Sequence, residues 1–168
     1  MIEYVMLIVI VISMSSVVYL WLRGYAPTNE EIECNNGVSI YISNVNCTKD
    51  KNNYTIHLTI KNTGKFNLRG FYIRGTNDTN QQLAAIDLSK KAIIGQSQKS
   101  GNEILFNSSL AHAFTNSFSP QNEMSFTFIT DEKIQKIEIT PTRIEKINDR
   151  DMLASCQKAI VSEKDICL

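Results

Sequence analysis

The sequence predicts an α+β protein in which a long hydrophobic helix precedes a C-terminal antiparallel β-sandwich of about six to eight strands. The helix is predicted by residues 1–22, in which Glu3 is the only charged residue. The strands are predicted by later segments in which apolar and polar residues alternate, a pattern typical of strands with one buried face. Turn-forming residues separate these segments at hairpin spacing, which favours an antiparallel sandwich. We therefore divide the chain into a helix (1–24), a neck (25–33) and a β-sandwich domain (34–168).

The first segment is long enough to cross a lipid bilayer. As a helix, 22 residues span about 33 Å at roughly 1.5 Å per residue. The segment is apolar on all sides, so we expect it to lie in lipid or inside a bundle of similar helices. It lacks a basic start and a small-residue cleavage site, so it is not an ordinary secretory signal peptide. Its polar hydroxyls belong to small side chains that either let helices approach closely or are simply tolerated in lipid: Ser13, Ser15 and Ser16.

Glu3 is the exception in this apolar segment. A carboxylate on a membrane helix costs roughly 2.5–3.5 kcal/mol near the bilayer centre and less near a helix end. One interpretation is that Glu3 faces the headgroups, where the positive end of the helix dipole favours it. The other is that Glu3 pairs with a cation, such as the N-terminal amine of this chain or of a neighbouring chain.

The trio Ile2-Glu3-Tyr4, followed by an uninterrupted apolar run, resembles the start of archaeal type IV pilins and archaellins. The resemblance is specific over roughly the first twenty residues and looser over the rest. It implies that a dedicated peptidase clips a short basic leader, that Glu3 helps to place each new subunit in a filament, and that the helices pack in the filament core. No basic leader ending in glycine precedes Met1, so we expect a chain that is already processed or that starts downstream of the true start.

After the neck, period-two alternation begins and recurs along the chain. In residues 54–60 the apolar side chains Tyr54, Ile56, Leu58 and Ile60 alternate with polar ones, which predicts one buried and one wet face. Residues 50–53 form the preceding hairpin loop, and 62–64 the next turn. The polar stretches at 76–101 and 110–118 are expected to be long loops, the first with a helical turn. Strands are predicted at residues 38–45, 54–60, 66–74, 103–106, 124–129, 134–144 and 159–161 or beyond.

Four cysteines indicate a domain that folds outside the cell, stabilised by disulfides. They are Cys34, Cys47, Cys156 and Cys167, and they allow three pairings. Proximity in sequence favours Cys34–Cys47 and Cys156–Cys167, each closing a short loop that would contribute about 3 kcal/mol. Free thiols and a zinc site are the rival interpretations. For zinc, the chain has no CxxC motif and its histidines lie far from the cysteines in sequence.

Four acceptor patterns for N-glycosylation agree with an external location. They begin at Asn46, Asn53, Asn77 and Asn107. Asn46 is a poor acceptor if its neighbour Cys47 is bridged. Asn77 and Asn107 lie in turn-like stretches and are better candidates.

The sequence offers little catalytic chemistry. The 17 basic and 17 acidic residues cancel, which argues against a nucleic-acid partner. His57 and His112 have no nucleophile and carboxylate in a recognisable arrangement, and the scattered glycines form no phosphate loop. A loose acidic set near the C-terminus does not match a calcium loop: Asp149, Asp151, Glu163 and Asp165. We expect no enzymatic activity, no metal and no cofactor.

These observations favour a structural subunit of an extracellular pilus-like or archaellum-like filament that serves adhesion or motility. Its expected partners are identical subunits, the membrane before assembly, the assembly machinery and the leader peptidase. The alternative is a single-pass, membrane-anchored surface β-sandwich that binds a ligand and never polymerises. A minor subunit that primes or caps the filament is a variant of the first hypothesis.

Overall fold

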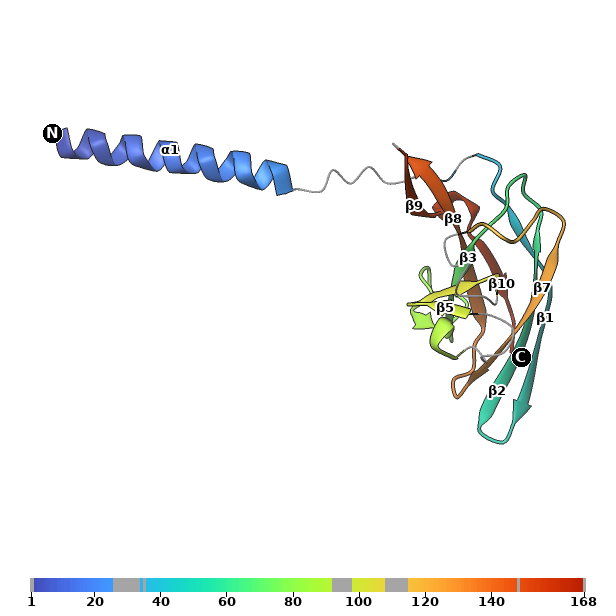
Figure 1. The fold of residues 1–168 in the computed structure, drawn as a ribbon. Helices are drawn as coiled ribbons and strands as arrows, with labels where there is room; N and C mark the ends of the chain where they lie inside the picture. Colours follow the sequence, from blue (N-terminus) through green and yellow to red (C-terminus); the bar gives the residue numbers. More distant parts are fainter. Residues whose placement is uncertain are drawn as a thin grey trace. The chain divides into compact units, whose positions relative to one another are not determined.

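The computed structural model describes residues 2–25, 34, 36–91, 98–107, 115–147 and 149–167 (Figure 1). The chain forms two compact units, Met1–Glu31 and Ile32–Leu168. The predicted neck lies outside the described residues except for Tyr25, which ends the helix.

The described part of the first unit is the helix α1 (Ile2–Tyr25), which confirms the predicted N-terminal apolar helix. Every side chain described in it, from Glu3 to Leu22, is exposed.

The second unit contains a small antiparallel sheet of three strands in the order β1-β2-β7. Its strands are β1 (Ile40–Asp50), β2 (Asn53–Asn62) and β7 (Glu123–Thr130). The turn between β1 and β2 confirms the hairpin predicted at residues 50–53, and Lys51 adopts a positive φ of 48° in it. Figure 1 shows this long hairpin beside β7.

A larger, seven-stranded antiparallel sheet completes the unit. Its main order is β10-β8-β3-β6-β5, with β4 paired to β3 and β9 paired to β8. The strands are β3 (Gly70–Thr76), β4 (Ile86–Asp87), β5 (Gln98–Ser100), β6 (Glu103–Leu105), β8 (Lys136–Ile147), β9 (Arg150–Ser155) and β10 (Val161–Lys164). Within the described ranges, the 3₁₀ turn η1 (Leu88–Lys91) follows β4, and the 3₁₀ turn η3 (Gln157–Ala159) connects β9 to β10.

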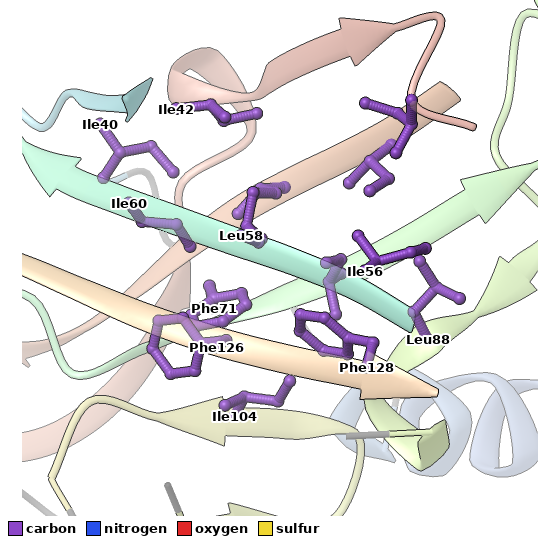
Figure 2. Packing of buried hydrophobic residues seen from close by; sticks show 14 of the residues in the cluster. Ile40, Ile42, Ile56, Leu58, Ile60, Phe71, Leu88, Ile104, Phe126 and Phe128 are labelled. Carbon is purple, nitrogen blue, oxygen red and sulfur yellow. The ribbon is translucent and has the colours of Figure 1, made fainter. Parts of the chain in front are cut away.

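The two sheets share one hydrophobic core. Ile56, Leu58 and Ile60 of β2 are fully buried, as the alternation predicts, and Figure 2 shows them beside Phe126 and Phe128 of β7. Phe71 of β3 meets Phe126 edge to face, with ring centroids 4.8 Å apart, which joins the larger sheet to the smaller one. Each such buried side chain contributes about 1.5–3 kcal/mol before entropy is counted.

The structure confirms an α+β chain with an apolar helix and a mostly antiparallel β-rich body. It does not confirm a sandwich, because the larger sheet is curled and the smaller one has only three strands. Each predicted strand overlaps an observed one, whereas β4, β5 and β9 were not predicted. The expected loop at 76–101 contains β4, η1 and β5, and residues 108–114 of the other expected loop lie outside the described residues.

The predicted disulfide pairing is wrong. The bridges are Cys34–Cys156 and Cys47–Cys167, with Cα atoms 5.1 and 5.2 Å apart. Residues 40–47 lie in the extended strand β1, and these eight residues alone span about 23 Å at roughly 3.3 Å per residue. This extension carries Cys47 away from Cys34, and a disulfide requires Cα atoms within about 7 Å. Short sequence separation therefore does not bring these cysteines together.

Candidate functional site

The strongest candidate for a functional surface is helix α1. Among the described residues it is the one helix long and apolar enough to cross a membrane, with a 20-residue span from Glu3 to Leu22. Such a segment near an N-terminus also meets the criteria for a signal sequence. Together with the two disulfides, it indicates a secreted or membrane-associated protein.

The serine hydroxyls of α1 bond to the helix's own backbone. Ser13 donates to the carbonyl oxygens of Val9 and Ile10 at 2.9 Å. Ser15 and Ser16 donate to carbonyl oxygens one turn earlier at 2.8 and 2.9 Å. These bonds remove most of the cost of placing a hydroxyl in an apolar medium, so the serines require no partner on another helix. With their hydroxyls bonded to the backbone, these small side chains project little from the helix.

Glu3 and Tyr4 lie exposed in the first turn of α1, which begins at Ile2. A carboxylate in the first turn interacts favourably with the positive end of the helix dipole. Neither Glu3 nor Tyr4 forms a hydrogen bond or ion pair with any other residue that the structure describes. A cationic partner for Glu3 would therefore come from outside those residues, as an N-terminal amine would.

The predicted glycosylation sites differ in their exposure. Asn46, on β1 beside the bridged Cys47, is exposed, and so are Asn53 at the start of β2 and Asn77 just after β3. Asn107 is half-buried, and Ser109, the hydroxyl residue of its pattern, lies outside the described residues.

Among the residues that the structure describes, those considered for catalysis or metal binding lie apart from one another. The exposed His57 has its Nδ1 atom 3.2 Å from Thr127 Oγ1 across the small sheet, and His112 lies outside the described residues. The acidic set is spread along one edge of β8, the edge away from β3: Asp151 is paired with Lys146 near the end of β8 and Glu163 with Ile137 near its start. Across the described ranges, no group of three or more metal-binding side chains occurs.

Sequence reasoning missed a buried ion pair at the centre of the larger sheet. Arg69 Nη1 lies 3.3 Å from Glu103 Oε2, with side chains 6% and 1% exposed. Thr142 on β8 donates its hydroxyl to the other carboxylate oxygen of Glu103. Burial raises the pKa of Glu103, and the Thr142 hydrogen bond and the Arg69 charge offset part of that rise. Nothing in the alternation around Glu103 signals a buried charge.

A polar hollow on the larger sheet was also missed. Tyr72 and Arg74 of β3, Asp87 of β4, and the chain around Cys156 contribute to its lining. These segments are far apart in the sequence, so no local pattern reveals the hollow.

Comparison of the chain with protein-family models, with curated proteins and with solved structures finds no match in any of the three.

Proposed function

We propose that this chain is a structural subunit of an extracellular filament and that it polymerises through helix α1. The observation that carries the proposal is a 20-residue apolar helix with every described side chain exposed and a carboxylate in its first turn. The free subunit would keep this helix in the membrane. Assembly would then move it among the helices of neighbouring subunits, where close packing replaces lipid.

The surface of α1 supports helix-to-helix packing. A shallow hollow lies between Ser13, Met14, Val17 and Val18, and the neighbouring hydroxyls fold back onto the backbone. A side chain from a second helix can fill such a hollow without leaving a polar group unpaired. One contact of this kind, repeated without closure, generates an open helical fibre.

Glu3 would set the register of each new subunit by pairing with a cation that the described part of its own chain does not provide. We propose the N-terminal amine of a neighbouring subunit as that partner.

The β-rich unit would then form the outer surface of the filament, and adhesion or motility would follow from the assembled fibre. A two-layered sandwich remains our proposal for the arrangement of its two sheets.

Cysteine cross-linking tests the packing directly, because all four native cysteines are bridged and an introduced cysteine is the only free thiol. A Val17→Cys variant, made in a host with the assembly machinery and treated with a short bis-maleimide, should yield covalent dimers and larger oligomers from the surface fraction. The matched control is Ser162→Cys, an exposed position on β10 in the other unit. Monomers alone from Val17→Cys would contradict polymerisation through α1.

The role of Glu3 is tested by removing only its charge. Glu3→Gln should abolish or strongly reduce filament yield while the protein still inserts in the membrane. The matched control, Glu163→Gln, changes an exposed carboxylate on β10 and should leave the yield unchanged. Normal filaments from Glu3→Gln would refute the proposed pairing.

A single-pass anchored binding module is the second candidate. The serine hydroxyls of α1 favour it as well, because they bond to the helix's own backbone and so suit a helix that stays alone in lipid. Its signature would be an unclipped N-terminus on a protein recovered as monomers in detergent. A clipped terminus on protein recovered from fibres would exclude it.

A further inference from the structure

We propose that the polar hollow on the larger sheet binds a neutral carbohydrate. Its volume of about 360 Å³ lies at the lower end of the roughly 300–1,000 Å³ range of small-molecule pockets, and polar atoms form most of its lining. The side chains that carry the argument are Tyr72, Arg74, Asp87, Asn102, Ser155 and Gln157. This inference does not depend on polymerisation.

Two charged side chains of opposite sign line the hollow, and the negative one, Asp87, also accepts hydrogen bonds from Ser89 and lies 3.7 Å from Lys90 Nζ. Arg74 and Asp87 occupy paired positions on β3 and β4, and they supply one positive and one negative charge. Arginine offers only donors and an ionised aspartate only acceptors, while amides and hydroxyls supply both. An anion would suit Arg74 but not Asp87. A sugar suits both, because each of its hydroxyls donates and accepts.

The hollow keeps polar groups without partners. Tyr72 is half-buried, yet its hydroxyl forms no hydrogen bond with the described residues, although a buried tyrosine usually finds one. Arg74 is exposed and has no ion-pair partner in the same part of the chain. Burial and the nearby Glu103 carboxylate raise the pKa of Tyr72, so the phenol remains a hydrogen-bond donor at neutral pH. Its ring adds an apolar face for the carbon-bound hydrogens of a sugar.

Two parts of the wall of the hollow are held in place, the segment around Cys156 and strand β3. Ser155 and Gln157 flank Cys156, which is bridged to Cys34, and Gln157 Nε2 donates to Ser155 Oγ at 3.2 Å. Tyr72 and Arg74 belong to β3, which is paired along both of its edges. A site that is already ordered loses less conformational entropy when it binds a ligand.

The same sugar chemistry can come from two sources. One is a glycan on another cell or molecule. The other is a glycan attached to this protein, for example at the exposed Asn77, which lies on the connection between β3 and β4.

The test uses the full chain in lauryldimethylamine oxide micelles, because a maltoside detergent would present a competing sugar. Methyl glycosides of glucose, mannose, galactose and N-acetylglucosamine, each at millimolar concentration, are examined by saturation-transfer NMR. At least one should receive saturation, with affinity reduced at least tenfold by Arg74→Ala and by Asn102→Ala. The matched control is Arg150→Ala, which removes an exposed arginine outside the hollow and should change nothing.

Three results would overturn the proposal: no glycoside binds, binding survives Arg74→Ala and Asn102→Ala, or only anions such as inorganic phosphate bind. The source is resolved by comparing protein from a glycosylating host with protein from a non-glycosylating one. Tighter binding by the unglycosylated protein and by Asn77→Gln identifies the protein's own glycan as the occupant. Equal affinity identifies an external glycan.

Discussion

Cys34 and Cys156 are 122 residues apart in the sequence, yet a disulfide holds their Cα atoms 5.1 Å apart. The second bridge, Cys47–Cys167, spans 120 residues and interleaves with the first. The C-terminal segment is therefore tied covalently both to β1 and to Cys34, where the described part of the second unit begins. These two bridges give the unit a covalent frame around its hydrophobic core.

The two bridges should contribute equally to stability. The loops that they close are nearly the same length, and in the chain-entropy description loop length sets the contribution. Replacing Cys34 and Cys156 together by alanine should lower the free energy of unfolding by about 2–5 kcal/mol, and so should replacing Cys47 and Cys167. Urea unfolding followed by near-ultraviolet circular dichroism measures both values. As a control, replacing Cys34 and Cys47 breaks both bridges, and a loss no larger than that of either native pair would contradict the observed pairing.

The interleaved bridges should also limit how far the second unit extends under force. When the chain is pulled from Cys34 and from its C-terminus, the disulfide transmits the force from Cys34 directly to Cys156. Only the residues after Cys156, about 12 of them, can then be stretched, to roughly 40 Å. With the bridges reduced, about 134 residues extend to roughly 450 Å. Single-molecule force spectroscopy of the full chain, with and without reducing agent, measures the difference. Equal extension in both conditions would rule out the bridging pattern.

Local patterns explain which parts of the fold are predictable from sequence. Strand β2 was predicted because Ile56, Leu58 and Ile60 are all buried on one face. Strand β9 was missed because its first four residues are all exposed, so no alternation marks it. Strand β6 was predicted at residues 103–106, but all three of its residues are buried, including Glu103, so no alternation shows that this carboxylate faces the interior. Alternation marks the buried side chains of a strand only where its other face is wet.

The candidate sites also differ in whether a local sequence pattern reveals them. Helix α1 was visible because one continuous segment forms it. The cysteine pairing, the Arg69–Glu103 pair and the polar hollow each join residues from separate segments, so they depend on how the sheets assemble. Proximity in sequence was a poor guide to the disulfides because an extended strand quickly separates neighbours along the chain.

Gly70 and Gly101 should respond differently to alanine. A Cβ at Gly70 would lie 2.4 Å from the carbonyl oxygen of Ile104, which belongs to the paired strand β6 and cannot move freely. We expect Gly70→Ala to cost about 1–3 kcal/mol, as overpacking does. Gly101 has open space around its Cβ position but a φ of +64°, so Gly101→Ala should cost about 1–2 kcal/mol through backbone conformation alone.

Further substitutions at positions 70 and 101 distinguish a steric clash from a backbone effect, with the free energy of unfolding measured in urea. Valine at position 70 should be worse than alanine because the clash grows with volume. Asparagine at position 101 should be better than alanine because it tolerates the left-handed conformation. If asparagine and alanine at position 101 destabilise the unit equally, backbone conformation is not the cause.

Glycosylation should occur at Asn53 and Asn77 rather than at Asn46. Asn53 follows the β1–β2 turn and Asn77 follows β3, and both are exposed. Asn46 lies within β1 directly before the bridged Cys47, where the strand and the disulfide hold the backbone extended. Glycopeptide mass spectrometry of protein from a glycosylating host measures occupancy at each site. Substantial modification of Asn46 would show that the acceptor is recognised before the strand and the bridge form.

The buried pair Arg69–Glu103 should make stability depend on pH in a defined direction. Burial raises the pKa of Glu103 above its ordinary value of 4.5, so the folded state holds the proton more tightly than the unfolded state. The stabilisation from this group is therefore fully present below the unfolded pKa and is lost as pH rises through the folded pKa. Glu103→Gln removes the titration. The stability of the native protein relative to Glu103→Gln should then increase as pH falls from 7 towards 4.5, as measured by urea midpoints.

Replacing Arg69 should make the stability of the protein depend more strongly on pH. Arg69→Met leaves the Glu103 carboxylate buried without its partner, which should cost about 3–5 kcal/mol at pH 7. It also removes a charge that lowers the pKa of Glu103, so the carboxyl should protonate at a higher pH and the cost of the substitution should shrink on acidification. The control is Arg150→Met, an exposed position on β9, which should change stability little at any pH. A cost of Arg69→Met that stays constant between pH 4.5 and 7 would mean that Glu103 is not the group left uncompensated.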